Sequence, residues 1–336
     1  MILRSRAPIR LDFAGGWTDV PPFSEKEGGA IVNATVNRYT YATLIPQEGS
    51  GIKIISADFN VFVEAEDFRK LEYDGNLDLI KAAIKVLEID QGLDLHVRCD
   101  APPGSGTGSS ASIGVALIGL LNTLQKEKLS PHEIAKLARN LEYRELHIAG
   151  GKQDQYASAL GGIIYLEFED PSVSNSRLNV PPHVIAELEK HCILCYTGKS
   201  RLSGDIIKIV MDAYIRGEKR TTEALRNLKR IAMEMKTALV CGDLKQFAAL
   251  LKENWENQKQ LDKSVTNPQI DHLFEVAYAN GAIGGKALGA GGGGCLLFYC
   301  ADNQEHTTRK ALLDEGIQII DFNFEFQGLQ TWVVSD

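Results

Sequence analysis

The 336-residue sequence has neither a long apolar run nor a hydrophobic leader. A membrane-spanning helix needs about 20 predominantly apolar residues, and no such stretch occurs. The first ten residues contain three arginines and no extended apolar core, which is not the pattern of a secretory signal. We therefore expect a cytoplasmic protein with no membrane partner.

Positive charge and paired cysteine motifs are also scarce. The formal net charge is -8, which argues against a nucleic-acid partner bound through a broad basic face. Cys192 and Cys195 form a CxxC spacing, but no second CxxC accompanies it. We predict buried strand thiols there rather than zinc ligands. The other four cysteines are scattered, so no disulfide framework is expected, in agreement with a reducing compartment.

Glycine, by contrast, is in excess, with 31 residues. An average protein contains about 7% glycine, and this chain exceeds that level. Clustered glycine allows the backbone to turn sharply or to approach a ligand closely. We expect turns at the pairs 28–29 and 161–162, and ligand-facing backbone at 15–16, 104–108, 150–151 and 289–294.

The pattern of strands and helices predicts an α+β protein. Residues 1–100 are mostly typical of strands, and a capping box at Ser130 and Glu133 begins a helix that we extend to about residue 146. Further helices are predicted near 203–216, 222–240, 243–262, 268–280 and 304–315. At roughly 150 residues per domain the length indicates about two domains. We place the boundary in the polar segment 171–182, read as an irregular connection, which gives domains 1–170 and 171–336.

A glycine-rich loop between a predicted strand and a helix is the strongest single motif. Its three alternating glycines let backbone N–H groups converge, and the helix N-terminus adds about half a positive charge. It is not a Walker loop, because no Gly-Lys-Ser/Thr closes it, and a dinucleotide fingerprint would need glycine at Ser109. A plain tight turn would need only one glycine. The predicted phosphate-binding residues are Pro103, Gly104, Ser105, Gly106, Thr107, Gly108, Ser109 and Ser110.

Three segments in order resemble the motifs of the GHMP kinases, the family of galactokinase, homoserine kinase, mevalonate kinase and phosphomevalonate kinase. They are RAPIRLDFAGGWTDVPPF at 6–23, PPGSGTGSSAS at 102–112 and GGKALGAGGGGCLLFY at 284–299. The resemblance implies a two-domain GHMP kinase fold. Its N-terminal domain would be like domain 2 of ribosomal protein S5, and its C-terminal α/β domain would be ferredoxin-like. It also implies ATP as phosphoryl donor and Mg²⁺ as cofactor.

Within the family, GGWTDVPPF, AGGKQDQYASALGG and GLQTWVV are most similar to the D-glycero-D-manno-heptose 7-phosphate kinases. The implied reaction moves the γ-phosphoryl group of ATP to the anomeric hydroxyl. The 1,7-bisphosphate product would serve nucleotide-activated heptose synthesis for lipopolysaccharide or capsule. Fucokinases share a GGW-S/T-D-x-PP element, so an unphosphorylated sugar such as L-fucose or an N-acetylhexosamine is the alternative. Two other functions also stay open: a decarboxylase of the diphosphomevalonate type and an inactive sugar-binding regulator. A homodimer is a further possibility that the sequence leaves open.

The resemblance assigns roles to particular residues. Asp154 matches the catalytic aspartate, and Arg10 matches the arginine beside it; whether Asp154 removes a proton or orients the hydroxyl stays open. Ser110 matches a magnesium ligand. Glu142 is our choice for the second ligand, with Glu145 as the alternative because the helix register is uncertain.

Sugar recognition is predicted on both sides of the catalytic aspartate. Asp19 aligns with the aspartate that binds sugar hydroxyls in the family, whereas galactokinases carry Glu-His where this chain has Gly16 and Trp17. That departure argues against galactose itself. The predicted substrate-binding residues are Trp17, Thr18, Asp19, Gly150, Gly151, Lys152, Gln153, Arg201, Gly291 and Gly292.

A phosphorylated sugar needs a second anion site, and residues 197–204 offer Lys199, Arg201 and hydroxyls just before a predicted helix. We predict that Arg201 binds the phosphate that the sugar carries, the alternative being a solvent-exposed loop charge. Arg201→Ala should then raise the Michaelis constant for the sugar phosphate far more than that for ATP in steady-state kinetics. Equal effects on the two constants would contradict this role.

Overall fold

The computed structural model describes residues 1–58, 60–199 and 203–334. Its largest element is an eight-stranded sheet with the order β12-β1-β2-β5-β3-β4, in which β6 also pairs with β2 and β7 pairs with β6. The strands are β1 (Ile2–Ala14), β2 (Gly29–Gln47), β3 (Ile52–Ser56), β4 (Val61–Ala65), β5 (Gly92–Cys99), β6 (Ile163–Glu169), β7 (Ser172–Arg177) and β12 (Gln330–Val334).

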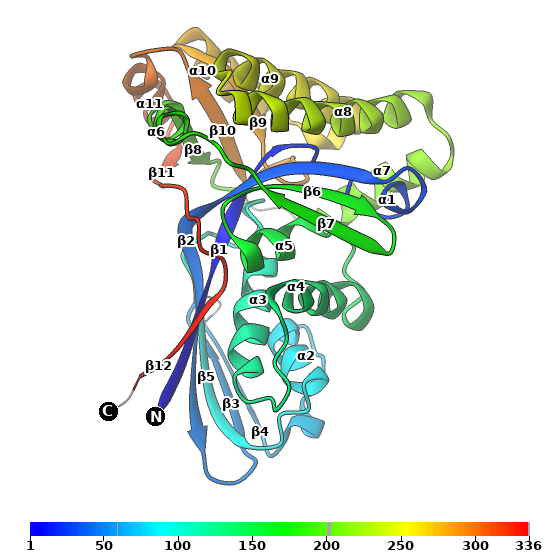
Figure 1. Cartoon of the computed structure of the whole chain (residues 1–336), viewed down its shortest axis with the longest axis vertical. Helices are drawn as coiled ribbons and strands as arrows, with labels where there is room; N and C mark the ends of the chain where they lie inside the picture. Colours follow the sequence, from blue (N-terminus) through cyan, green and yellow to red (C-terminus); the bar gives the residue numbers. More distant parts are fainter. Residues whose placement is uncertain (59, 200–202, 335–336) are drawn as a thin grey trace.

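Two long antiparallel strands, β1 and β2, run through most of the molecule (Figure 1). One end of β2 pairs with β5 and the other end pairs with β6, so the sheet changes neighbours along its length. Residues 7–14 of β1 are buried without interruption. Such continuous burial is expected of a strand that is covered on both faces.

Four helices lie on one side of the large sheet: α2 (Asp78–Val86), α3 (Ser109–Asn122), α4 (Pro131–Asn140) and α5 (Gln153–Leu160) (Figure 1). Helix α3 packs on β1, β2 and β5, α5 packs on β1 and β2, and α4 packs on α3 and α5. The predicted capping box begins α4, since the Ser130 N–H donates to Glu133 Oε2 at 2.8 Å. The predicted helix is interrupted after residue 140, where a π-helical turn, Leu141–Glu145, follows. The strand-rich prediction for residues 1–100 missed α2.

The second half of the chain forms a smaller antiparallel sheet with the order β11-β8-β10-β9. Its strands are β8 (Cys192–Tyr196), β9 (Ala282–Ala287), β10 (Cys295–Cys300) and β11 (Gln318–Ile320). The helices are α6 (Pro182–His191), α7 (Ser203–Ile215), α8 (Lys219–Cys241), α9 (Leu244–Leu261), α10 (Pro268–Ala279) and α11 (Glu305–Asp314), with short α1 (Phe23–Lys26) in the first half. The predicted helices of this half are confirmed.

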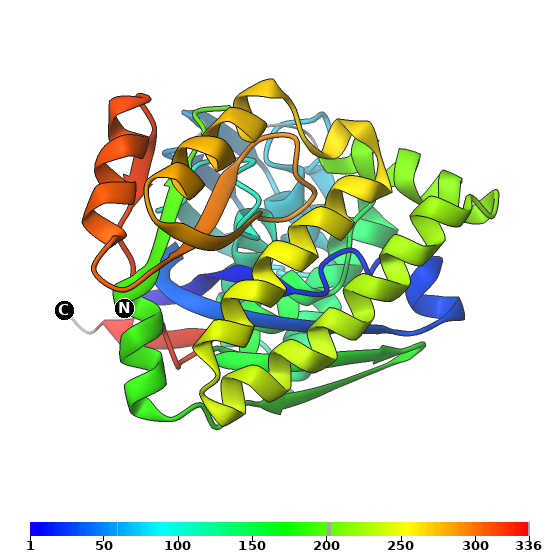
Figure 2. The ribbon, with the colours of Figure 1, turned by 90° about the horizontal axis from the view of Figure 1, so that it is seen from above.

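Helices α8 and α9 pack together as a hairpin and cross the long strands β1 and β2 (Figure 2). Phe13 of β1 and Phe247 of α9 meet edge to face with their ring centroids 5.2 Å apart. A hydrophobic core therefore joins the two halves of the chain. The predicted α+β class is correct, and Cys192 and Cys195 lie buried in β8 as expected. Among the described residues no helix is long and apolar enough to cross a membrane.

The polar segment 171–182, for which the sequence predicts an irregular connection, contains β7 and the start of α6. Strand β7 is exposed on nearly all its residues, so it shows no apolar alternation from which a strand could be predicted. The boundary between 170 and 171 stays a prediction. Strands from both sides of it, β6 and β7 as well as β1 and β12, belong to the large sheet.

The C-terminal segment returns to the large sheet beside Gly161. The N–H of Gly162 donates to the carbonyl of Glu325 at 2.9 Å, and the N–H of Leu329 donates to the carbonyl of Ala159 at 3.2 Å. Gly161 has φ 69° and ψ 169°, a conformation almost restricted to glycine, and a Cβ there would overlap the backbone of Gln327 and Gly328.

We predict that Gly161→Ala lowers the free energy of unfolding by about 3 kcal/mol or more, because strain and overlap combine. Gly217→Ala is the matched control, since Gly217 has φ 72° but no atom near its hypothetical Cβ. Its cost should be about 1 kcal/mol from strain alone. Urea unfolding of both variants measures the difference, and equal costs would show that the C-terminal segment does not constrain Gly161.

Candidate active site

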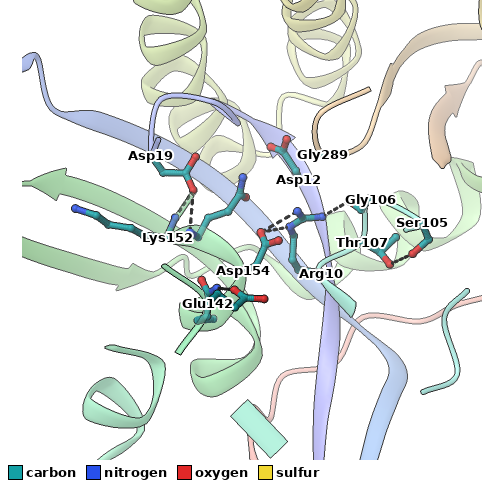
Figure 3. A network of polar contacts seen from close by, with 12 residues as sticks. Arg10, Asp12, Asp19, Ser105, Gly106, Thr107, Glu142, Lys152, Asp154 and Gly289 are labelled. Carbon is teal, nitrogen blue, oxygen red and sulfur yellow. Dashed lines mark hydrogen bonds and ion pairs between the residues drawn. The ribbon is translucent and has the colours of Figure 1, made fainter. Parts of the chain in front are cut away.

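A cleft of about 300 Å³ lies where three segments meet: residues 103–110, here called the phosphate loop after its predicted role, the first motif segment (residues 6–23) and the loop before α5. Figure 3 shows Arg10 and Asp154 at its centre, with Asp19 and Glu142 on either side of them. The structure therefore brings together residues from four separate parts of the sequence. The predicted site residues that line the cleft are Arg10, Trp17, Asp19, Gly104, Gly106, Gly108, Ser109, Ser110, Glu142, Gly150, Gly151, Gln153 and Asp154.

The phosphate loop is built by three glycines in the left-handed region. Gly104, Gly106 and Gly108 have φ values of 67°, 76° and 74°, which cost other residues conformational energy. Between them, the hydroxyls of Ser105 and Thr107 turn inward and hydrogen-bond to each other at 2.6 Å, fully buried. Ser105 and Thr107 thus shape the loop with their side chains, while its glycine backbone faces the cleft.

Arg10 of β1 connects the loop to the predicted catalytic aspartate. Its Nε and Nη2 atoms lie 2.8 Å from Asp154 Oδ1, and its Nη1 donates to the carbonyl of Gly106 at 2.5 Å. The Arg10 side chain is buried, whereas that of Asp154 is 28% exposed and lines the cleft. A planar guanidinium held at both sides fixes the direction of the carboxylate.

Ser110 and Glu142 form the pair predicted to hold the metal. Ser110 Oγ donates to Glu142 Oε1 at 2.6 Å, and the Gln155 amide donates to the other carboxylate oxygen. Burial raises the pKa of Glu142, and the Ser110 hydrogen bond opposes this shift. The π-helical turn directs Glu142 inward, whereas Glu145 accepts a hydrogen bond from the Tyr73 hydroxyl at 2.7 Å in an exposed position. A hydroxyl and a carboxylate are oxygen donors that suit Mg²⁺.

Asp19 is buried on another side of the cleft from the Arg10–Asp154 pair, and it caps the start of α5 from outside the helix. Its Oδ2 accepts the N–H groups of Lys152 at 2.7 Å and Gln153 at 2.9 Å. A Cβ on Gly151 would overlap this carboxylate, so only glycine fits there. Burial raises the pKa of Asp19 to about 6; the charge of Asp154 adds to the shift, and the backbone N–H groups oppose it.

The neighbouring Trp17 and Thr18 have different surroundings. Trp17 has φ 84°, lines the cleft and packs in a cluster that includes Ile207 of α7. The Thr18 hydroxyl donates to the carbonyl of Gly15 at 2.8 Å and accepts the N–H of Ala30 at 3.1 Å. Thr18 therefore holds the turn, and it is not among the residues that line the cleft.

Three further predicted positions lie apart from the cleft. The Lys152 ammonium points away from the centre and pairs with Asp170 at 3.1 Å, so only its backbone serves Asp19 (Figure 3). Gly291 and Gly292 pack against Val265. Gly289 and Ala290 take their place in the cleft wall. Arg201 lies outside the described residues.

Arg139 is a cleft residue that the sequence analysis missed. It is buried in the last turn of α4, and its Nη2 donates to the carbonyl of Gly150 at 2.7 Å. Burial lowers the pKa of Arg139, and the charges of Glu142, Asp19 and Asp154 oppose that shift. Residues three apart on a helix are neighbours, so the spacing of Arg139 and Glu142 could have indicated that Arg139 lies near the site.

A second cavity of about 310 Å³ lies on the other side of the phosphate loop. It shares Gly104, Ser109 and Ser110 with the first cleft, and Pro103 lines it. Most of its wall is apolar, with Val61, Leu79, Ile80, Val97, Ala101 and Ile113. An apolar cavity with a few polar groups is typical of a small-molecule site.

Because the folded pKa of Asp19 is raised, its ionisation opposes folding. The native protein holds the Asp19 proton more tightly than the unfolded chain does. The contribution of Asp19 to the free energy of unfolding is therefore largest below pH 3.8 and is lost as the pH rises toward 6. We predict that Asp19→Asn gains about 3 kcal/mol relative to the wild type between pH 3.8 and 7. Urea unfolding at the two pH values measures this difference, and a pH-independent difference would contradict the raised pKa.

Comparison with known proteins finds matches to one family in both halves of the chain. The family model described as GHMP kinases N terminal domain matches residues 78–162, and that described as GHMP kinases C terminal matches residues 224–314. The chain is 33% identical to a D-glycero-alpha-D-manno-heptose 7-phosphate kinase from Campylobacter jejuni, over 98% of each protein.

Two further sugar kinases are similar to this chain. The structure of a D-glycero-D-manno-heptose 1-phosphate kinase from Bacteroides thetaiotaomicron superposes with a TM-score of 0.83 at 30% identity, covering 99% of this chain and 100% of that one. An L-fucokinase/L-fucose-1-P guanylyltransferase from Bacteroides fragilis is 27% identical over 94% of this chain and 36% of its own length. With its phosphate loop, its Arg10–Asp154 pair and these matches, the chain belongs to the GHMP kinase family.

Proposed function

We propose that this protein transfers the γ-phosphoryl group of ATP to the anomeric hydroxyl of D-glycero-D-manno-heptose 7-phosphate, with Mg²⁺ as cofactor, to give the 1,7-bisphosphate. The observation that carries the proposal is Asp154, held by Arg10 beside the phosphate loop and facing the same cleft as Asp19. Phosphoryl transfer needs phosphate binding, charge compensation and an oriented hydroxyl, and these groups supply each of them.

The two cavities divide the substrates. We assign the nucleoside of ATP to the apolar second cavity and its phosphates to the loop that both cavities share. The loop backbone and the N-terminus of α3 would bind the phosphate oxygens. The sugar would then occupy the first cleft, between Asp154 and Asp19.

Ser110 and Glu142 would hold the metal ion. Their oxygens already lie 2.6 Å apart, and Gln155 orients the carboxylate from behind. When bound there, Mg²⁺ would compensate the negative charge of the phosphates. The buried surroundings of Glu142 strengthen its interaction with a cation.

Asp154 would accept a hydrogen bond from the anomeric hydroxyl and orient it for attack, or accept its proton as the phosphoryl group moves. Arg10 holds the Asp154 carboxylate and reaches Gly106 of the phosphate loop, so it joins the acceptor side of the site to the donor side. Its positive charge would stabilise the negative charge that develops between them.

Sugar specificity would come from Asp19 and Trp17. Asp19 uses Oδ2 for two backbone N–H groups, which leaves Oδ1 for a sugar hydroxyl. The indole of Trp17 forms part of the wall. The similarity to the fucokinase supports the alternative of an unphosphorylated sugar such as L-fucose or an N-acetylhexosamine.

We further propose that the enzyme acts in the cytoplasm, in nucleotide-activated heptose synthesis for lipopolysaccharide or capsule. The six cysteines are unpaired, as expected in a reducing compartment. A homodimer stays a prediction that size-exclusion chromatography with light scattering would test.

The test is a turnover comparison of heptose 7-phosphate, L-fucose, galactose and mannose with ATP and Mg²⁺. We expect heptose 7-phosphate to have a kcat/KM at least about tenfold above the others, a difference of about 1.4 kcal/mol in transition-state binding. ³¹P NMR of the product should show a new phosphate on the anomeric oxygen. A preference for L-fucose would favour the alternative, and transfer to none of the sugars would overturn the proposal.

A further inference from the structure

A buried ion pair next to the cleft joins the first motif segment (residues 6–23) to the third (residues 284–299), which is called the third glycine-rich segment below. Lys286 Nζ on β9 lies 2.7 Å from Asp12 Oδ2 on β1 and donates to the Asp12 carbonyl at 3.0 Å. The two side chains are 0% and 2% exposed. Burying two charges is costly, and an apolar pair of similar size is often as stable. Folding stability therefore gives little reason for these two residues.

On one side the pair adjoins the catalytic arginine. Asp12 and Arg10 are two residues apart on β1, so their side chains leave the same face of the strand. Burial lowers the pKa of Lys286, Asp12 opposes this shift, and the charge of Arg10 adds to it. Asp154, Arg10, Asp12 and Lys286 thus form a sequence of alternating charges.

Asp12 has acceptor capacity to spare. Its Oδ1 is buried and has no hydrogen-bond partner among the described residues. Without Lys286, the Asp12 carboxylate would be a buried charge without compensation on the same face of β1 as Arg10, and it would attract the Arg10 guanidinium. Arg10 would then be drawn away from Asp154 and Gly106.

On the other side the pair fixes the third segment against the phosphate loop. Lys286 lies three residues before Gly289, and a Cβ on Gly289 would be 3.0 Å from the Gly106 carbonyl oxygen. A Cβ on Gly106 would in turn be 2.6 Å from the carbonyl oxygen of Leu288. Gly106 is therefore held between Arg10 and the third segment.

The same carboxylate also reaches the sugar side of the cleft. A Cβ on Gly16 would overlap the Asp12 carboxylate, so the chain passes directly over it before Trp17. Asp12 is thus in contact with the backbone that places Trp17, and Lys286 holds Asp12 in that position.

We propose that Asp12 and Lys286 are positioning residues for phosphoryl transfer, which hold Arg10 on Asp154 and hold Gly106 between β1 and the third glycine-rich segment. The inference rests on the proposed kinase chemistry but not on which sugar is the acceptor. Neither residue lines the cleft, so both act through Arg10 and the loop.

The experiment is a kinetic double-mutant cycle between Lys286 and Arg10. Lys286→Met should lower kcat about 100-fold, the size expected for a small misplacement of reacting groups, and leave both Michaelis constants within about threefold. The same change is then made in an Arg10→Met background and measured by single turnover at high enzyme concentration. There it should lower the rate constant no more than about threefold, because the arginine through which Lys286 acts is already absent. Additive effects, or a Lys286→Met enzyme with kcat near the wild-type value, would overturn the proposal.

Two controls separate positioning from folding. Asp12→Asn combined with Lys286→Met removes both charges, and its kcat should exceed that of Lys286→Met at least about tenfold, because no stray carboxylate then competes for Arg10. An equal kcat in the two variants, compared at equal folded fraction by circular dichroism, would contradict that competition. Lys310→Met removes an exposed ion pair with Asp314 at 2.6 Å and should leave kcat unchanged.

The test does not depend on the proposed sugar, because the wild-type enzyme is first assayed to find which sugar it phosphorylates. All variants are compared with the sugar that the wild-type enzyme phosphorylates fastest. Failure of the wild type on heptose 7-phosphate overturns the proposed acceptor, whereas an additive cycle overturns only the positioning role.

Discussion

The site depends on one guanidinium that connects its own strand with two other elements. Arg10 leaves the long strand β1, binds Asp154 at the start of α5 and donates to Gly106 of the phosphate loop. Each of these elements comes from a different part of the sequence, and β1 and α5 are anchored in hydrophobic cores. Because Arg10 is buried, it has few other rotamers, so the aspartate and the loop keep a fixed relation.

Three of the glycines around the site leave room for carboxylates. A Cβ on Gly16 would overlap Asp12, and a Cβ on Gly151 would overlap Asp19. A Cβ on Gly108 would lie 3.2 Å from the Asp154 carboxyl carbon. Three acidic side chains thus pack directly on backbone, which holds them more precisely than contacts with flexible side chains would.

Local signals in the sequence predicted much of the fold. The capping box at Ser130 and the apolar periodicity of α7 to α10 gave helices that the structure confirms. Strand β7 was missed because it is exposed on both faces, and the π-helical turn after α4 has no periodic signature of its own.

The site was predicted less evenly than the fold. The resemblance to the family motifs indicated Arg10 and Asp154, and the three alternating glycines indicated the phosphate loop; the structure places all of them at one cleft. The directions of side chains could not be predicted from the sequence, because tertiary packing sets them. Lys152 pairs with Asp170, and the Thr18 hydroxyl donates to the backbone of Gly15. The partnership of Asp12 with Lys286 joins residues 274 positions apart, which no local pattern reveals.

The most direct measurement is the single-turnover rate constant of phosphoryl transfer in Asp154→Asn, with dissociation constants of ATP and sugar measured alongside. The amide oxygen can still accept from Arg10, so the variant removes the charge and keeps the contact. We predict a rate constant lower by at least about 100-fold, with both dissociation constants within about threefold of wild type. A rate constant close to the wild-type value would contradict the central role of the Arg10–Asp154 pair.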